Sequence, residues 1–259
     1  MGSVRFGIPL DLAEDIIEAR GIRAAVETGT YKGESAALLR SLCPRVWTIE
    51  LSPAQHAEAA ASHAGISGLE FLQGNSAALL PELLEHIGEP VLFWLDGHVM
   101  PGDPDFGATE CPVISEIAAV NESVHGRDAC ILIDDAVLFH AAPPFGLHAA
   151  EWPMITEVID LLRAVGDRYV TVLDDVVIAG PPEIRAIVDQ WWARVVADRG
   201  GTTTMVPLHR LEQAWNPTPV QAVRRLAKSL LRSAPDRFQP RRGGTVRRRS
   251  PPRPTGLSA

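Results

Sequence analysis

The sequence predicts an α/β fold built on a doubly wound, mostly parallel, Rossmann-like sheet. Short apolar runs rich in β-branched and aromatic residues alternate with longer segments of helical periodicity. Two of the runs, Val91–Gly97 and Ala129–Ala136, are almost wholly apolar, as expected of strands that are buried on both faces. Strands and helices that alternate at this spacing form right-handed βαβ units, which place helices on both faces of the sheet.

The expected strands are short, and most of them end at a Gly or an acidic residue. In chain order they are Arg23–Gly29, Arg45–Leu51, Leu69–Gly74, Val91–Gly97, Ala129–Ala136 and two strands within Tyr169–Gly180, broken near Asp174-Asp175. The first five are separated by helical segments, so we expect them to be parallel, whereas the last two follow each other directly and predict a hairpin.

The expected helices begin where capping residues precede an apolar periodic segment. In chain order they are Gly33–Leu42, an Ala-rich helix that follows Ser52-Pro53 and ends near His63, a Leu-rich helix capped by Ser76 that ends near Ile87, Pro112–Val120, Trp152–Val165 and Pro182–Arg199. Trp191 and Trp192 are predicted on opposite sides of the last helix. At most one of them would then lie in the core, and the other is available for the second subunit of a homodimer.

The chain has two regions of opposite net charge. The last 39 residues, Gln221–Ala259, hold eleven basic residues and one acidic residue, a charge of +10, so the overall charge of −8 leaves −18 on the first 220 residues. We expect an N-terminal helical segment (1–22), one catalytic domain (23–200), a C-terminal extension (201–233) and a disordered Arg/Pro-rich tail (234–259). The tail lacks aromatic residues apart from Phe238, so nucleic acid is disfavoured as its partner.

Composition excludes several classes of protein. No stretch approaches the roughly 20 consecutive apolar residues of a membrane helix, so we expect no membrane partner. The first residues lack the apolar core of a signal peptide. Cys43, Cys111 and Cys130 are odd in number and widely spaced, which favours free thiols over disulfides or a zinc site. A cytoplasmic location is the expectation.

Acidic residues stand at the ends of four predicted strands. Glu27 and Gly29 end the first, Glu50 the second, Asp96 the fourth, and the pair Asp134-Asp135 the fifth. In doubly wound sheets, ligands bind outside the carboxyl ends of the strands. The sequence therefore predicts one polar crevice at this edge.

The segment after the first strand, Val26–Ser35, has a Gly-containing turn of the form E-x-G-x-x-x-G. It lacks the second Gly that pyrophosphate binding uses, and Lys32 is not in a P-loop frame. Glu50 follows about twenty residues after the turn, where a carboxylate accepts hydrogen bonds from the hydroxyls of a ribose. An adenosyl ligand is indicated, and both NAD and S-adenosylmethionine satisfy this pattern.

Five segments carry a resemblance, namely VETGTYKGES, VWTIELS, LQGNS, FWLDGH and ILIDDA. Together they resemble the class I S-adenosylmethionine-dependent methyltransferases, and among these the metal-dependent macrocin O-methyltransferase type, over about Ala24–Gly180. The resemblance implies a seven-stranded sheet that ends in the 169–180 hairpin. It also implies cofactor contacts by Glu27, Gly29, Thr30, Gly33, Glu50, Leu51, Gly74, Asn75, Ser76 and Asp96. Asn75 departs from the family pattern, which often has Asp there.

Asp96, Asp134 and Asp135 end two strands that neighbour each other in this fold, so their carboxylates should converge. A hard divalent cation would compensate their mutual repulsion, and ligation by carboxylates alone favours Mg²⁺ over zinc. Such an ion would lower the pKa of a substrate hydroxyl. Asp96 and His98 are the catalytic candidates, with His98 considered as a general base. The loops Val99–Cys111 and His140–His148 are expected to contact the acceptor.

The first hypothesis is methyl transfer from S-adenosylmethionine, with Mg²⁺, to the hydroxyl of a small molecule such as a sugar or natural product. The alternative is a non-catalytic module of the same fold that binds RNA or an acidic partner through its basic tail. Such a module should bind no cofactor, and its association should be salt-sensitive. An NAD-dependent enzyme is disfavoured by the single-Gly turn and by the lack of a Tyr-x-x-x-Lys pair.

Overall fold

The computed structural model describes residues 7–99, 109–141 and 147–198. The predicted extension 201–233 and the tail 234–259 lie outside these residues, as do most of the loop 99–111 and the middle of the loop 140–148. No helix within the described ranges combines the length and the apolar character that a membrane span requires.

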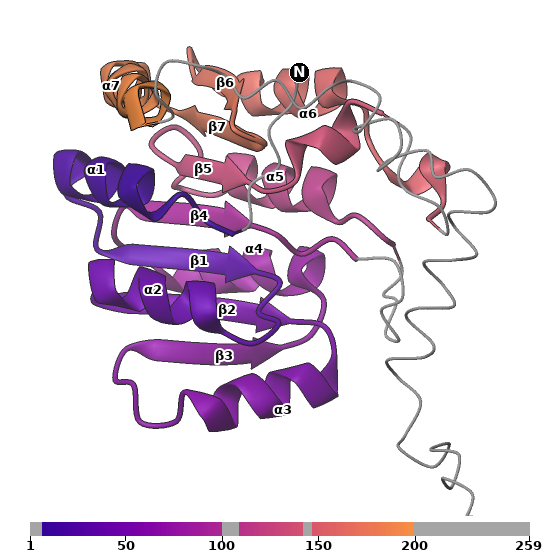
Figure 1. Ribbon diagram of the computed structural model, residues 1–259. Coiled ribbons are helices and arrows are strands. Elements are labelled where there is room, and N and C mark those ends of the chain that lie inside the picture. The colour runs from indigo at the N-terminus through magenta and orange to yellow at the C-terminus, as the bar shows by residue number, and fades with distance from the viewer. Residues whose placement is uncertain (1–6, 100–108, 142–146, 199–259) are drawn as a thin grey trace, which may run out of the picture. The chain divides into compact units, whose positions relative to one another are not determined.

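The structure confirms the predicted seven-stranded sheet, with five parallel strands and a C-terminal antiparallel hairpin (Figure 1). Its strands are Ala24–Thr28 (β1), Arg45–Glu50 (β2), Leu69–Gln73 (β3), Val91–Leu95 (β4), Cys130–Ile133 (β5), Tyr169–Leu173 (β6) and Val176–Gly180 (β7). They lie in the order β3-β2-β1-β4-β5-β7-β6. The first five are parallel to one another, and β7 is antiparallel to both β5 and β6.

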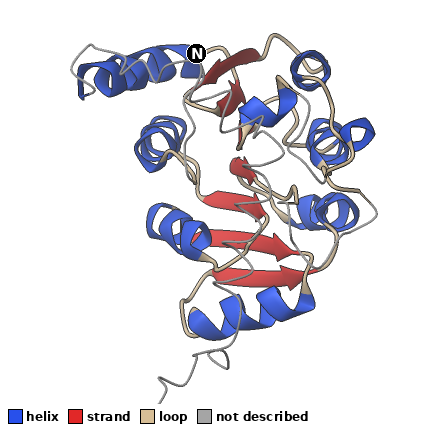
Figure 2. Cartoon of the chain, turned by 45° about the vertical axis from the view of Figure 1, so that its right-hand side comes forward, coloured by secondary structure: helices blue, strands red, loops and turns tan. Residues whose placement is uncertain are grey.

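Helices cover both faces of the sheet (Figure 2). They are Leu10–Arg20 (α1), Glu34–Leu42 (α2), Pro53–Ser62 (α3), Ser76–His86 (α4), Val113–Glu122 (α5), Ile155–Arg163 (α6) and Ile184–Asp198 (α7). Helices α1, α2 and α7 pack together on one face, and α4, α5 and α6 form a row on the other. Helix α3 lies beside β2 and β3 at the edge of the sheet.

Two predicted helix starts are wrong, and local chemistry explains both. Helix α4 is capped by Asn75, whose side-chain oxygen accepts a hydrogen bond from the Ala77 N–H at 2.9 Å, while Ser76 is the first helical residue. Helix α6 begins at Ile155 instead of Trp152. Trp152 precedes Pro153 and is extended, because a residue before proline is driven out of the α-helical region.

The core beneath α1 and α7 contains two fully buried tryptophans, Trp94 of β4 and Trp191 of α7. Trp191 packs in it and donates a hydrogen bond from Nε1 to Asp11 Oδ2 at 2.9 Å. Trp192 is partly buried against the same cluster, because successive helix residues lie about 100° apart and not on opposite sides. The side chains of Cys43, Cys111 and Cys130 are free thiols, and all three are buried.

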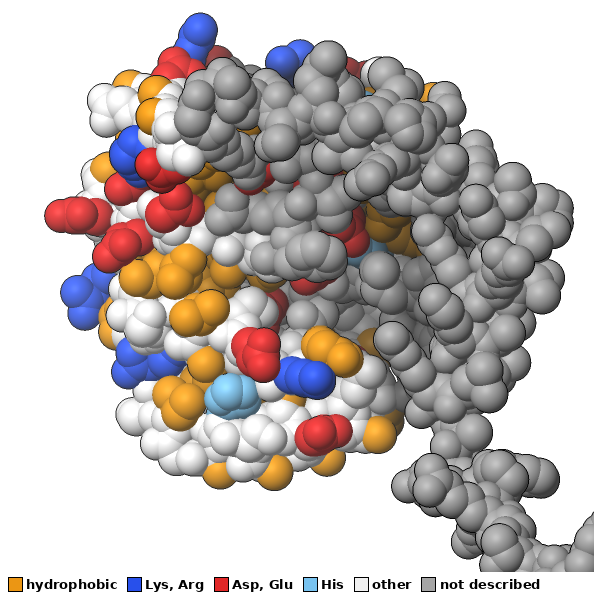
Figure 3. Space-filling view, in the orientation of Figure 1, with side chains coloured by type: hydrophobic (Ala, Val, Ile, Leu, Met, Phe, Trp, Pro, Cys, Tyr) orange, Lys and Arg blue, Asp and Glu red, His pale blue; other side chains and the backbone are white. Residues whose placement is uncertain are grey.

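Acidic and basic side chains are interspersed with hydrophobic ones on the face of the molecule drawn in Figure 3.

The turn after β1 fits against β4 only because residue 29 has no side chain. Gly29 has a φ of 81°, and a Cβ at this position would lie 2.1 Å from the carbonyl oxygen of Asp96. Its N–H donates to the carbonyl oxygen of Ile49 at 2.9 Å, so the same residue also joins the turn to β2. Gly29 therefore sets the distance between the ends of β1, β2 and β4.

Gly29→Ala should lower the free energy of unfolding by about 2 kcal/mol or more, because it adds a steric collision to the cost of a left-handed backbone. Gly65→Ala is the matched control, since Gly65 has a φ of 89° but no atom within 4 Å of its Cβ position. Its cost should be confined to the backbone, about 1 kcal/mol. Urea unfolding of both variants measures the difference, and equal losses would contradict the packing argument.

Candidate functional site

The predicted polar residues meet at one edge of the sheet. Strands β1 to β5 are parallel to one another, so their carboxyl ends share this edge. The order of the strands reverses between β1 and β4, and this switch point is where doubly wound sheets bind ligands. The side chains at the switch point form two connected groups, one around Glu27 and Glu50 and one around His98.

Glu27 lies at the centre of the first group and is fully buried. Its Oε2 accepts a hydrogen bond from the Thr48 hydroxyl at 2.5 Å, and its Oε1 accepts one from the Ser35 hydroxyl. Thr30 lies 2.6 Å from the Thr48 hydroxyl oxygen and donates to it, since the Thr48 proton is given to Glu27. The first turn of α2, the loop and β2 are thus joined through one carboxyl group.

Burial is the main cause of an unusual titration at Glu27. It raises the pKa of the carboxyl group from 4.5 to about 7, and the charge of Glu50 adds to this rise. The hydrogen bonds from Ser35 and Thr48 act in the opposite direction but do not cancel it. Near neutral pH the carboxyl group is therefore poised between its neutral and charged forms.

Glu50 faces the turn after β1, as the prediction requires. Its Oε2 accepts a hydrogen bond from the Tyr31 N–H at 2.8 Å, and its Oε1 accepts one from the Ser52 N–H at 2.9 Å. Each carboxylate oxygen can accept more than one hydrogen bond, so acceptor capacity remains for a ligand hydroxyl. The two backbone donors fix the carboxylate in place.

The end of β3 is joined to the same group. The Gly74 N–H donates to the Glu50 carbonyl oxygen at 2.8 Å, and the Gln73 side-chain amide donates to the Leu51 carbonyl oxygen at 3.0 Å. Asn75 uses its side-chain oxygen to cap α4. Its amide N–H₂ remains a donor, which differs from the acceptor role that the resemblance implies.

Sequence reasoning missed Glu116, a buried carboxylate of α5. Its Oε1 accepts a hydrogen bond from the Ser76 hydroxyl at 2.5 Å, and it is also hydrogen-bonded to Thr28. Burial raises the pKa of Glu116. A signal was present, because Glu116 lies on the buried stripe that Val113, Ile117 and Val120 form. An acidic residue on the apolar face of a helix marks a buried polar contact.

Gly33 is the predicted site residue that the structure places elsewhere. It caps α2 with a φ of 76°, and its Cβ position would lie 2.9 Å from His63 and 3.3 Å from Phe71. These contacts belong to α3 and β3. Gly33 therefore shapes the helix start, and its missing side chain makes room for His63.

The second group contains His98 and the three predicted metal ligands. His98 Nε2 lies 3.0 Å from Asp135 Oδ2 and 3.8 Å from Asp96 Oδ1. The His98 side chain is only 5% exposed, whereas that of Asp96 is 31% exposed and so is the accessible member of the pair. Asp134 is buried, and its Oδ1 accepts a hydrogen bond from the Asp135 N–H at 2.8 Å.

The charges of this second group perturb one another. Burial raises the pKa of Asp96, and the neighbouring Asp134 and Asp135 raise it further, against the opposing effect of His98. Burial and the charge of Asp135 raise the pKa of Asp134 to about 7. Burial alone would lower the pKa of His98, but the hydrogen bond to Asp135 and the surrounding carboxylates outweigh it, so the pKa is raised.

The three aspartates have the right chemistry for Mg²⁺ but not the right arrangement. Mg²⁺ holds oxygen ligands at about 2.0–2.1 Å, so two oxygens on one ion are at most about 4.2 Å apart. Within the described ranges, Asp96, Asp134 and Asp135 do not form a group whose ligand atoms all lie within 4.8 Å of one another. As the side chains stand, the ion does not fit between them.

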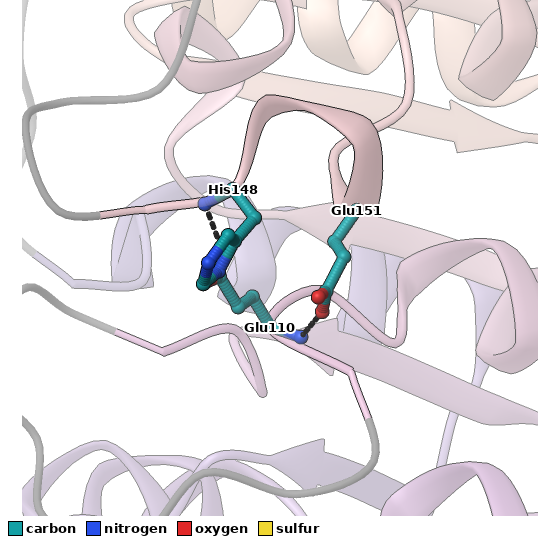
Figure 4. A group of neighbouring side chains, drawn as sticks. All are labelled: Glu110, His148 and Glu151. Atoms are coloured by element: carbon teal, nitrogen blue, oxygen red, sulfur yellow. Dashed lines mark hydrogen bonds and ion pairs between the residues drawn. The ribbon is translucent and has the colours of Figure 1, made fainter.

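A group that meets this distance criterion lies farther out, where two loops come together (Figure 4). It consists of Glu110, His148 and Glu151. The buried Glu110 carboxylate accepts hydrogen bonds from His148 Nδ1 at 2.6 Å, from the His148 N–H at 2.7 Å and from Trp152 Nε1 at 2.9 Å. Glu151 in turn accepts from the Glu110 N–H at 2.8 Å. These bonds engage both oxygens of Glu110, so the group joins the two loops.

No protein-family model matches the chain, and no curated protein matches it. Solved structures do show likeness. The SAH-bound methyltransferase PaMTH1 from Podospora anserina is 16% identical, over 68% of this chain and 79% of that one, with a TM-score of 0.47.

Two further structures are similar to a comparable degree. The O-methyltransferase TomG from Streptomyces achromogenes, in complex with SAM, is 20% identical over 69% of this chain and 82% of that one, with a TM-score of 0.47. The O-methyltransferase from Bacillus cereus, in complex with SAH, is 18% identical over 68% and 81%, with a TM-score of 0.46.

Glu27→Gln should change how stability depends on pH. The folded pKa of about 7 exceeds the ordinary 4.5, so the folded protein keeps a proton that the unfolded chain releases as pH rises between these values. Glu27 therefore destabilises the fold progressively over that range, by up to about 3 kcal/mol above it. The variant should gain stability relative to the wild type between about pH 4.5 and pH 8.

Denaturant unfolding at several pH values measures this gain, with the exposed Glu82→Gln as control. A difference between Glu27→Gln and wild type that stays constant with pH would show that Glu27 is ionised throughout.

Glu110→Ala should lower the midpoint of thermal unfolding, because it removes the acceptor of three hydrogen bonds and leaves the Trp152 indole N–H unpaired. Glu151→Ala is the matched control, since this exposed carboxylate accepts the Glu110 N–H. We expect a clearly smaller effect from the control when both are followed by circular dichroism. Equal midpoints for Glu110→Ala and Glu151→Ala would contradict the conclusion that Glu110 joins the two loops.

Proposed function

We propose that the chain is an S-adenosylmethionine-dependent methyltransferase that methylates the hydroxyl group of a small molecule, such as a sugar or a natural product. The observation that carries the proposal is the convergence of Glu27, Glu50 and Asp96 on the turn at Gly29. The backbone oxygen of Asp96 lies against Gly29, Glu50 accepts the Tyr31 N–H, and the charges of Glu50 and Asp96 are both coupled to Glu27.

The sign of this charge separates the two adenosyl ligands that the sequence leaves open. NAD carries a negatively charged pyrophosphate, which three carboxylates would repel. S-adenosylmethionine carries a positive sulfonium and an ammonium group, which the same carboxylates attract. When bound, it supplies a methyl group that a nucleophilic oxygen can accept.

Named residues of this chain have the chemistry to hold that cofactor. Glu50 has acceptor capacity for the two ribose hydroxyls. Glu27 can pair with the ammonium group, which would favour its charged form and release the proton that burial retains. Gly29 lets the turn lie against the end of β4, and Ser76, fixed by Glu116, lies at the start of α4.

On the acceptor side, Asp96 is the group that can receive a proton from the substrate hydroxyl. It is partly exposed, and burial and neighbouring carboxylates raise its pKa toward the range useful for proton transfer. His98 lies behind it and donates to Asp135, so it orients the aspartates. Assistance by Mg²⁺ stays a prediction from the sequence, and no step is assigned to the ion because the aspartates do not fit it as they stand.

Isothermal titration calorimetry with S-adenosylmethionine and with its demethylated product tests the proposal. We expect saturable binding by the full chain and at least a tenfold weaker affinity for Glu50→Ala, equivalent to about 1.4 kcal/mol. Glu82→Ala, which changes an exposed carboxylate on α4, should bind like the wild type. Absence of binding, or unchanged affinity in Glu50→Ala, would remove the proposed function and favour a non-catalytic module.

A further inference from the structure

The carboxylates at the ends of β4 and β5 need compensation that the chain itself can provide. The three aspartates that follow these two strands would repel one another if all were charged and nothing stood between them. The sequence predicts a divalent cation as this partner, but the space beside two of the aspartates holds an imidazole. His98 Nε2 lies 3.0 Å from Asp135 Oδ2 and 3.8 Å from Asp96 Oδ1.

The imidazole is held in this position by packing. Its side chain is 5% exposed, and the ring lies edge-on to Trp152 with 5.5 Å between ring centroids. Trp152 is fixed in turn by its hydrogen bond to Glu110. The ring therefore cannot leave the aspartates without displacing buried neighbours.

The backbone on either side of His98 is also fixed. The Asp96 N–H donates to the Thr28 carbonyl oxygen at 3.0 Å, and the Val99 N–H donates to the Glu110 carbonyl oxygen at 2.9 Å. Gly97 lies so close to α5 that a Cβ there would be 3.0 Å from Glu116 Oε1. A turn bounded in this way leaves His98 little freedom to swing aside for an ion.

We propose that His98 takes the place of the divalent cation in this crevice, so that Asp96, Asp134 and Asp135 are organised by an imidazole and bind no Mg²⁺. His98 is then a positioning residue that holds Asp135 and faces Asp96. The role of His98 in catalysis rests on the proposed function, whereas the absence of cation binding at these aspartates does not. Removal of the ring should leave three carboxylates around an open space, which is a site for a hard divalent cation.

Cation binding by the full chain without cofactor tests this directly. Titrations with Mg²⁺ by calorimetry, and with Mn²⁺ by electron paramagnetic resonance, compare the wild type, Asp96→Asn and His98→Ala. The affinity for either cation should be the same in the wild type and in Asp96→Asn, because Asp96 binds no ion. His98→Ala should bind at least about tenfold more tightly than the wild type, and the double variant His98→Ala/Asp135→Asn should lose this gain.

His86→Ala is the matched control, because His86 is an exposed histidine whose Nδ1 contacts a backbone oxygen of its own helix. It should bind cations like the wild type. Any ion held by Glu110, His148 and Glu151 would be common to all these proteins and so would not alter the comparison.

Two outcomes would overturn the proposal. One is Mg²⁺ binding by the wild type that Asp96→Asn weakens tenfold or more, a result that needs no variant of His98 to fold. The other is a folded His98→Ala protein, verified by circular dichroism, that binds no more tightly than the wild type. Binding of the demethylated cofactor, measured in parallel, reports on the proposed function separately.

Discussion

The parallel register of five strands is the constraint on which the rest of the structure depends. It brings the acidic ends of β1, β2, β4 and β5 to one edge, where their charges would repel one another. The fold compensates the charge of each carboxylate in a different way. Burial favours the neutral form of Glu27, two backbone N–H groups bind Glu50, and His98 lies between Asp96 and Asp135. The carboxylates that remain charged give this edge the negative potential on which the proposed binding of a positively charged cofactor depends.

A second set of contacts holds these carboxylates from behind. Glu116 on α5 fixes Ser76 at the start of α4 and touches the turn at Gly97, so two helices of one face support the ends of β3 and β4. Asp175, in the turn between β6 and β7, accepts the Val137 N–H at 2.8 Å and so fixes the segment that follows Asp134 and Asp135. The antiparallel hairpin thereby supports the crevice without contributing a strand end to it.

The two sides of the proposed site are held by different kinds of contact. The side proposed for the cofactor is held by β-strand ends and helix starts, whose backbone bonds are continuous with the sheet. The side proposed for the acceptor depends on loops that Glu110 joins through His148 and Trp152. This division matches the general behaviour of such folds, in which the sheet positions a common ligand and the loops select the variable one.

From the sequence alone, the hairpin, the apolar core strands and the acidic strand ends could be predicted, because periodicity and residue type act locally. The total of seven strands followed from the resemblance. The sequence did not determine the cap of α4, where Asn75 competes with Ser76, or the start of α6, where Pro153 intervenes. The hydrogen-bond and ion-pair partners of each carboxylate became apparent only in the tertiary structure. Glu116 and Glu110 acquire their partners from segments about 40 residues away, and His98 reaches Asp135 across two strands. Such contacts depend on side-chain packing in three dimensions, which no local pattern encodes.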